Sequence, residues 1–223
     1  QNDFTVATAR YTAALDRAMA SNFDILNSIN GFYAASNFVS RDEFKTFAGA
    51  FLHRQPGIQA FEWVPRVTAE KRDEYEARAR RDGIADFAIK ERNADGSLVA
   101  ARERDAYFPV YYIVPHAGNE RVMGFDLASD AARLSTLSKA RITGQLAVSG
   151  RVRLVQETGD QFGFLAFLPI FRKDVPHDTP RQRRENLDGF ALGVFRIGDL
   201  METTSRSMSA PPAGLDIYLF DQG

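Results

Sequence analysis

Two acidic residues lie inside apolar segments of this sequence, where an ionised carboxylate is costly unless something donates to it. Glu62 lies in IQAFEWVPRV and Asp126 lies in RVMGFDLASDAARL. A pair of buried carboxylates can serve acid–base hydrolysis when their environments separate the two pKa values. A single buried carboxylate can instead hold a ligand that offers N–H groups, and each such bond contributes about 1.5–3 kcal/mol.

Asp126 has three alternative roles: it contacts a ligand, forms an ion pair, or caps the helix that follows. Capping is the weakest of them, because Ser129 and Asp130 stand at the better position for that helix. The arginines considered for an ion pair are Arg121, Arg151 and Arg153. Ligand contact is therefore the leading interpretation, and the ion pair is its rival.

Aromatic residues gather close to Asp126 in the sequence. The segment YFPVYYIVP, residues 107–115, is dense in them, and strand alternation predicts that Phe108 and Tyr112 share one face. Phe164 lies on a later apolar segment, where it could stack with Phe108 around a ligand. Such density usually means core packing. An aromatic pocket with one acid is the sharper interpretation, because ligand sites are mostly apolar with few polar groups.

Other chemistries lack the residues they need. The chain has no cysteine, and its three histidines are far apart without the spacing of a zinc site. Neither a phosphate-binding glycine loop nor a GxSxG elbow occurs. The formal net charge is −1, and the basic runs at 78–81 and 181–184 stand beside acids without interleaved aromatics. We expect no metal, no cofactor, no catalytic residue and no nucleic-acid partner.

The first element that would position these residues is a long helix over residues 4–37. Most globular helices run roughly 8–20 residues, so this one is unusual. Apolar side chains recur every seven positions along it, at Phe4, Tyr11, Ala18, Ile25 and Phe32. The stripe indicates either a parallel dimer seam or a face packed on its own domain, and both can hold at once.

Short strands and a few helices follow. A capping box at Ser40 opens a helix, and further helices are expected at 68–82, 129–143 and 199–208. Strands are expected at 58–67, 87–92, 107–115, 122–127, 146–150, 151–157, 162–171, 189–197 and 215–220. Most strands follow one another through short turns, which indicates an α+β fold with antiparallel sheets. A polar loop at 173–188 is the expected boundary, and no apolar run approaches the length of a membrane span.

Several of these stretches together resemble the CHASE domain, the extracytoplasmic sensory module of histidine kinases and diguanylate cyclases. They are QPGIQAFEWVPRV, YFPVYYIVPHAGNERVMGFDLASDAARL, TGQLAVSG, and GFLAFLPIFRKDVP leading to GFALGVFRIGDLME. They span residues 55–202 in the family's order. One departure is Ala131, where relatives often carry proline after the SD of DLASD.

The resemblance implies a stalk helix at 1–37 followed by two PAS-like antiparallel-sheet subdomains. The membrane-distal one, at 38–172, would bind the ligand, and the membrane-proximal one would follow at 173–223. It also implies transmembrane helices outside this sequence, a periplasmic or extracellular location at an inner or plasma membrane, and a homodimer through the N-terminal helix. The parent protein would carry a histidine kinase or diguanylate cyclase output domain, so this chain would be a sensor and not an enzyme.

The resemblance also implies a ligand site. In plant members the ligand is a cytokinin, an adenine derivative, and an aspartate in the matching DL segment hydrogen-bonds the purine; Asp126 stands at that place. Here the ligand would be an adenine-type cytokinin or another small metabolite. The expected ligand-binding residues are Asp126, Phe108, Tyr112, Phe125, Ala147, Val148, Ser149, Glu157, Thr158 and Phe164. The competing functions are a ligand-free dimerisation or protein-binding ectodomain and a periplasmic hydrolase that uses Glu62 and Asp126.

Overall fold

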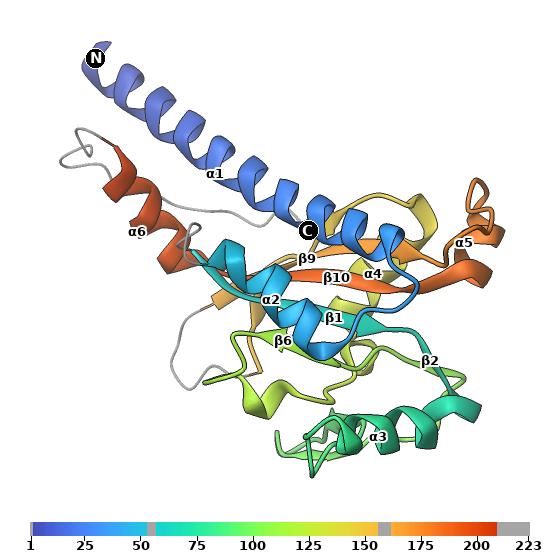
Figure 1. Ribbon diagram of the computed structural model, residues 1–223. Helices are drawn as coiled ribbons and strands as arrows, with labels where there is room; N and C mark the ends of the chain where they lie inside the picture. Colours follow the sequence, from blue (N-terminus) through green and yellow to red (C-terminus); the bar gives the residue numbers. More distant parts are fainter. Residues whose placement is uncertain (1, 53–56, 156–161, 209–223) are drawn as a thin grey trace.

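A long helix, α1 (Asn2–Ala35), begins the chain and extends well beyond the body of the domain (Figure 1). The computed structural model describes residues 2–52, 57–155 and 162–208. The apolar stripe of α1 packs on its own domain: Tyr11 and Ile25 are buried, and the Tyr11 hydroxyl donates to the Met201 carbonyl at 3.1 Å. The own-domain interpretation of the stripe is confirmed, and the dimer seam stays a prediction.

Six strands of the described chain form one antiparallel sheet in the order β6-β1-β10-β9-β7, with β8 also pairing with β9. These strands are β1 (Ile58–Pro65), β6 (Tyr112–Val114), β7 (Ala147–Val148), β8 (Val152–Arg153), β9 (Phe162–Phe171) and β10 (Leu187–Arg196). The three long strands, β1, β9 and β10, are buried through most of their length on both faces. The α+β fold with antiparallel sheets is therefore confirmed.

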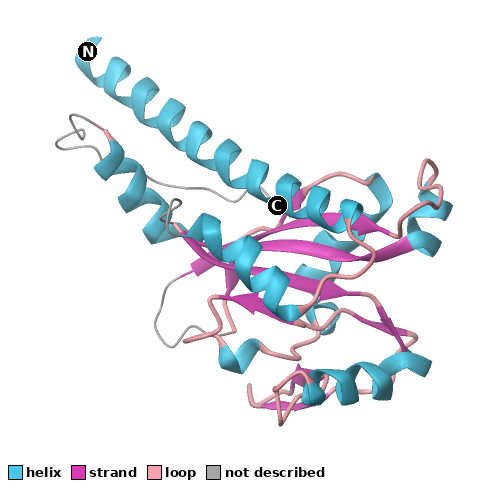
Figure 2. Cartoon of the chain, in the orientation of Figure 1, coloured by secondary structure: helices cyan, strands magenta, loops and turns pink. Residues whose placement is uncertain are grey.

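Helices lie on both faces of this sheet (Figures 1 and 2). One face, here called the α1 face, is covered by α1 and by α2 (Arg41–Leu52), and Trp63 stacks there on Tyr33 of α1 at 4.3 Å. The opposite face, here called the α4 face, is covered by α4 (Ala131–Thr143) and by the chain that precedes it. Because both faces of the sheet are covered, the residues that point to either face of the long strands are mostly apolar.

A smaller lobe lies at the far side of the sheet from the start of α1 (Figure 1). It contains β2 (Val67–Thr68), η1 (Ala69–Lys71), α3 (Arg72–Arg81), β3 (Lys90–Arg92), β4 (Leu98–Ala100), β5 (Ala106–Tyr107), η2 (Glu120–Val122) and η3 (Leu127–Ser129). Its strands pair as β2 with β5 and β3 with β4. Within this lobe Gly124 has a φ of +80° and lies against the backbone of Ala88, where an added Cβ would be 2.1 Å from the Ala88 carbonyl oxygen.

Local signals in the sequence predicted several helix ends correctly. The Ser40 capping box forms: the Ser40 amide donates to Glu43 at 2.8 Å, and the Glu43 amide donates back to the Ser40 hydroxyl at 3.2 Å. Asp130 caps α4 by accepting from the Arg133 amide at 3.0 Å. Gly144 ends α4 in the left-handed conformation. The helix expected at 199–208 is α6 (Ile197–Ser207).

The polar loop expected at 173–188 contains a helix, α5 (Pro180–Asn186), so that expectation was wrong in part. A capping signal was present in the sequence: Thr179 accepts from the Gln182 amide at 3.2 Å, and Gln182 accepts from the Thr179 amide at 3.0 Å. Pro180 at the first turn completes the signal, because proline is favoured at that position. The segment of α5 is short and polar, so no apolar periodicity indicated a helix there.

The expected boundary between residues 172 and 173 falls in the connection between two paired strands. β10 follows that boundary and lies between β1 and β9 in the main sheet. The division into two subdomains stays a prediction, because the strand expected at 215–220 lies outside the described residues. Glu157, Thr158 and the side chain of Phe4 also lie outside them.

Candidate functional site

Asp126 is fully buried, with an exposed fraction of 0%, and protein groups satisfy its carboxylate. The amides of Phe108 and Ala128 donate to it at 2.8 and 3.1 Å. The guanidinium of Arg104 donates at 3.0 Å and forms an ion pair. Burial raises the pKa of Asp126, and these donors oppose the rise. Asp126 therefore caps the short helix η3 and pairs with an arginine that was not among the expected partners.

Arg104 connects Asp126 to a second buried acid. Its guanidinium also donates to Glu91, which accepts from Arg102 as well, at 2.7 Å. Burial opposes ionisation of Glu91, but the hydrogen bonds from both arginines outweigh it and lower the pKa of Glu91. The Arg104 side chain is 25% exposed and lines an open hollow of about 850 Å³ beside α3. The network therefore reaches the surface through its two arginines, since the Arg102 side chain is 82% exposed, and not through Asp126.

The expected aromatic residues divide between the two faces of the sheet. Phe108 contacts Phe190 at 5.7 Å on the α4 face, whereas Tyr112 pairs directly with Trp63 and shares the α1 face with it. The prediction that Phe108 and Tyr112 lie on one face was wrong. Alternation applies to a continuous strand, and the segment 107–115 is broken between β5 and β6.

Phe164 also lies on the α1 face, opposite Phe108. It stacks on its direct strand partner Phe195, with 4.7 Å between the ring centres. Phe195 in turn meets Phe23 of α1 edge to face, with 6.4 Å between the ring centres. A ligand cannot be sandwiched between Phe108 and Phe164, because the sheet separates them. Phe125, by contrast, lies on the α4 face, where the guanidinium of Arg133 lies 5.6 Å from its ring.

The expected residues of the following strand have mixed environments. Ala147 is buried and pairs with Phe167, while the Val148 side chain is 42% exposed. Ser149 is buried, and its hydroxyl accepts from the Leu165 amide at 2.9 Å and donates to the Gly150 carbonyl at 2.8 Å. The protein itself therefore uses the polar atoms of this serine side chain.

Glu62, the other acid of the sequence pattern, has a different arginine near it. It is buried on the α4 face, and burial raises its pKa to about 8, an effect that Arg133 opposes. Asp126 is instead tied to Arg104. The two carboxylates of the hydrolase alternative therefore have different environments: Asp126 is ion-paired to Arg104, whereas Glu62 has only the charge of Arg133 acting on it.

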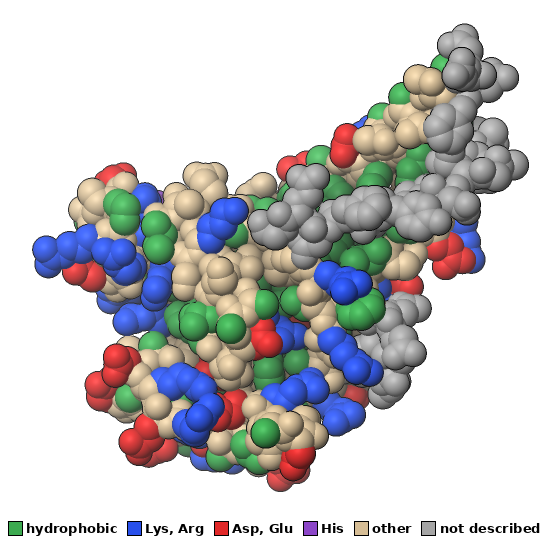
Figure 3. Space-filling model, turned by 180° about the vertical axis from the view of Figure 1, so that it is seen from behind, with side chains coloured by type: hydrophobic (Ala, Val, Ile, Leu, Met, Phe, Trp, Pro, Cys, Tyr) green, Lys and Arg blue, Asp and Glu red, His purple; other side chains and the backbone are tan. Residues whose placement is uncertain are grey.

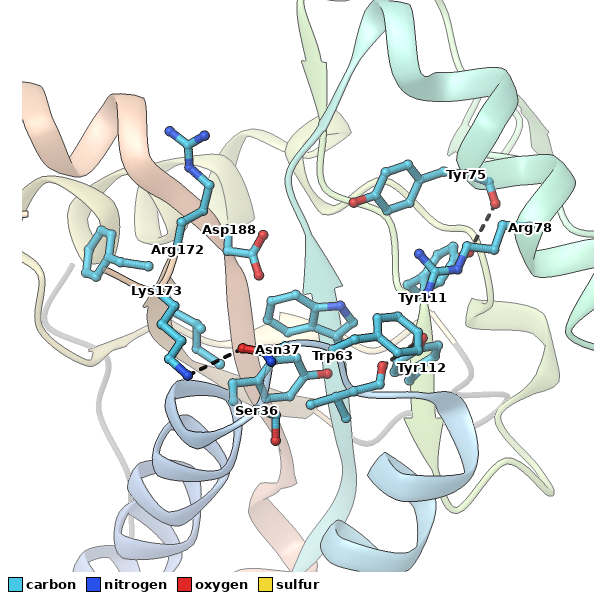
Figure 4. Close-up of a pocket in the computed structure, with 15 residues that line it drawn as sticks. Ser36, Asn37, Trp63, Tyr75, Arg78, Tyr111, Tyr112, Arg172, Lys173 and Asp188 are labelled. Atoms are coloured by element: carbon cyan, nitrogen blue, oxygen red, sulfur yellow. Dashed lines mark hydrogen bonds between the residues drawn. The ribbon is translucent and has the colours of Figure 1, made fainter. Parts of the chain in front are cut away.

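A pocket that the sequence did not predict lies between the end of α1, the sheet and α3 (Figure 4). Its cavity volume is about 340 Å³, within the range of about 300–1,000 Å³ typical of ligand sites. We call it the aromatic pocket, and its lining residues are Tyr33, Ser36, Asn37, Phe38, Val39, Trp63, Tyr75, Arg78, Tyr111, Tyr112, Ile170, Phe171, Arg172, Lys173 and Asp188. It contains four tyrosines and the only tryptophan of the sequence.

Trp63 lines the aromatic pocket and stacks on Tyr33, with 4.3 Å between the ring centres, and Asp188 lies beside the indole in Figure 4. Among the described residues, no side chain or amide donates to the carboxylate of Asp188. Burial raises the pKa of Asp188, although Arg172 and Lys71 oppose the rise. The Tyr33 hydroxyl, also buried, has no hydrogen-bond partner in the described part of the chain, and burial raises its pKa. The pocket thus holds polar groups that the protein leaves unsatisfied.

The signal for this pocket was present in parts of the sequence. The segment 107–115 is dense in aromatic residues, and two of its tyrosines, Tyr111 and Tyr112, line the pocket. The sequence pattern gives no such signal for Asp188, because it assigns this residue to the polar loop at 173–188, whereas the residue belongs to β10. The end of α1 adds a wall that no local pattern could connect with these strands.

Lys and Arg side chains are interspersed with Asp and Glu over the face drawn in Figure 3, in keeping with the net charge of −1. Within residues 2–52, 57–155 and 162–208, no helix combines the length and the apolar character needed to cross a bilayer. Over the same ranges, no group of three or more acidic or histidine side chains could hold a metal ion. The aromatic pocket is therefore the strongest candidate site among the described residues.

The described part of the chain is thus an antiparallel α+β domain with a long leading helix and a pocket beside that helix. Residues 37–223 match the CHASE domain, and the chain belongs to this family of extracytoplasmic sensory domains, which are found in histidine kinase receptors.

One similar protein is hybrid signal transduction histidine kinase A of Dictyostelium discoideum, which is 22% identical over 189 residues. The match covers 82% of this chain but only 9% of the length of that protein. Among solved structures, the ligand-binding domain of the amino acid chemoreceptor PctC of Pseudomonas aeruginosa, in complex with GABA, matches with a TM-score of 0.47 and 12% identity. That match covers 92% of this chain and 63% of the chemoreceptor chain.

Proposed function

We propose that the chain is the extracytoplasmic sensory domain of a transmembrane receptor and that it binds a small molecule in the aromatic pocket. The observation that carries the proposal is the position of this pocket at the end of α1, where Tyr33 and Ser36 form part of its wall. A molecule in the pocket contacts α1 and the sheet together. Its occupancy therefore bears directly on how the long helix sits against the domain.

Signalling would follow from a population shift. A ligand shifts an equilibrium only through its different affinities for two states, and a hundredfold preference corresponds to about 2.7 kcal/mol. The two states here differ in how α1 packs on the sheet, and the membrane helices outside this sequence would transmit the difference. The similarity to a hybrid histidine kinase supports a kinase output, and a diguanylate cyclase is the alternative output.

A thermal-shift screen tests the binding function. The compounds are purines, adenine-type cytokinins, amino acids and organic acids, and a ligand at one hundred times its dissociation constant stabilises the fold by about 2.7 kcal/mol. Ser36→Trp places an indole in the aromatic pocket and is expected to abolish the shift. Ser28→Trp is the matched control, because Ser28 is exposed on α1, which ends just before Ser36, and the hydroxyls of both serines donate to a carbonyl four residues earlier.

The same screen distinguishes a ligand site at Asp126, which the sequence predicts, from a site in the aromatic pocket. Ligand contact by Asp126 stays a prediction, and it requires that a ligand replace one of the donors the carboxylate already has. Loss of the thermal shift in Asp126→Asn, with a full response in Ser36→Trp, would move the site to Asp126. If no compound changes the melting temperature of the wild type, the ligand-free ectodomain is the better description. Turnover of a compound would favour the hydrolase.

A further inference from the structure

We infer that the aromatic pocket takes a zwitterion of the amino-acid type, with its ammonium group at Asp188 and its acidic group at Arg78. The inference rests on the proposed function and adds the chemical class of the ligand. Both side chains line the same cavity of about 340 Å³, and they form no ion pair with each other. Opposite charges that share a pocket without pairing leave room for a ligand that bridges them.

Asp188 supplies an anionic end that lacks a partner. Its carboxylate lies beside Trp63 in Figure 4, and within the described residues no ion pair or hydrogen bond reaches it. The cations near the pocket have other hydrogen-bond partners or act only through their charge: Arg172 donates to the amide side chain of Asn186 at 2.7 Å, and Lys173 donates to Asn37 at 3.4 Å. Arg172 and Lys71 act on Asp188 through their charge, without a hydrogen bond to it. A half-buried carboxylate among aromatic rings gains most from a ligand cation, because the rings also attract positive charge.

Arg78 supplies the cationic end. Its guanidinium lies 4.3 Å from the centre of the Phe38 ring, and Phe38 is itself 56% exposed. Over the described ranges, no carboxylate or carbonyl accepts from this guanidinium. Stacking on a ring occupies one face of the guanidinium and leaves its edge of N–H groups available. That edge matches the two oxygens of a carboxylate.

The surroundings disfavour a ligand with a single charge. A simple amine would satisfy Asp188 but would bring a fourth cation into a pocket that Arg78, Arg172 and Lys173 already line. A simple acid would satisfy Arg78 and leave Asp188 desolvated without a partner, which is costly. The indole of Trp63, which lies between Asp188 and Arg78 in Figure 4, offers an apolar surface between the two ends. A compact molecule with an ammonium group, a carboxylate and an apolar part would satisfy Asp188, Arg78 and the apolar surface between them.

Isothermal titration calorimetry of the whole chain tests this inference with three matched sets of probes. They are L-amino acids, the amines left when their carboxylate is removed, and the carboxylic acids left when their amine is removed. At least one amino acid is expected to bind, and its amine and its acid are each expected to bind at least tenfold more weakly. This comparison changes only the ligand, so it does not depend on the folding of any variant.

Two variants then assign the ends. Asp188→Asn is expected to weaken the amino acid at least tenfold while it barely changes the affinity for the matching acid. Arg78→Gln is also expected to weaken the amino acid at least tenfold, while it barely changes the affinity for the matching amine. The controls are Asp86→Asn and Arg81→Gln, which carry the same changes at exposed positions outside the pocket, the second on the same helix α3.

The outcomes separate this inference from the proposed function. Binding of amino acid, amine and acid with equal affinity, or full affinity in both pocket variants, would overturn the zwitterion. Binding of a neutral purine that Ser36→Trp abolishes, together with no binding of any amino acid, would overturn the zwitterion and leave the sensory pocket intact. Binding of no compound of any class would overturn both.

Discussion

Glu62 should make the stability of this domain fall as the pH rises. Its side chain is 2% exposed, and burial raises its pKa from 4.5 to about 8, against an opposing effect of Arg133. The folded state therefore holds the proton more tightly than the unfolded state. The favourable contribution is complete below the unfolded pKa and is lost as the pH rises through the folded pKa. The difference of 8 − 4.5 corresponds to at most about 5 kcal/mol, at about 1.4 kcal/mol per unit.

Denaturant unfolding of the wild type and of Glu62→Gln measures this effect. Glutamine has nearly the same volume and cannot ionise, so the variant should lack the loss of stability between about pH 5 and about pH 9. The wild type should become less stable than the variant as the pH rises, with a difference approaching a few kcal/mol. Glu74→Gln, an exposed acid on α3, is the matched control and should behave as the wild type does. Parallel pH profiles of wild type and Glu62→Gln would refute a buried, proton-binding Glu62.

Two further changes test the lobe that carries Asp126. Arg104→Met removes the cation shared by Asp126 and Glu91 and should cost about 3–5 kcal/mol in chemical unfolding; a loss below about 1 kcal/mol would show that solvent replaces Arg104. Gly124→Ala should cost more than Gly83→Ala, because both have positive φ but only Gly124 would set its Cβ 2.1 Å from a carbonyl oxygen. Equal melting temperatures for the two alanine variants would contradict that close approach.

Local patterns predicted the elements whose signals lie close together in the chain. The strand expected at 162–171 has those bounds in the structure, and α4 begins at the expected cap and ends before Gly144. The broken segment 107–115 was misread, because its hydrogen-bond partners come from distant positions. Pro109, for example, bridges to Asp126, and the Tyr111 amide donates to the Trp63 carbonyl at 2.9 Å. Strand alternation cannot reveal such a break.

The site was harder to predict for the same reason. Arg104 lies 22 residues from Asp126 in the chain and was not considered as its partner. The aromatic pocket draws its charged ends from α3 and β10, which only the folded sheet brings together. Asp188 also stands among aromatic side chains, but the sequence-based prediction named Asp126, and ligand binding by Asp126 stays a prediction.

The position of the aromatic pocket along α1 determines what a bound molecule could do. Tyr33 lies in the last turn of α1 and stacks on Trp63, whereas Tyr11, about 33 Å away at 1.5 Å per residue, contacts α6. A helix of this length acts as a lever, so a tilt of about 3° at the pocket would displace α1 by about 2 Å at Tyr11. Met201 of α6 would meet that displacement directly, because it accepts the Tyr11 hydroxyl. On the proposed function, the contact between α1 and α6 is therefore where occupancy of the pocket would first change the packing of the two helices.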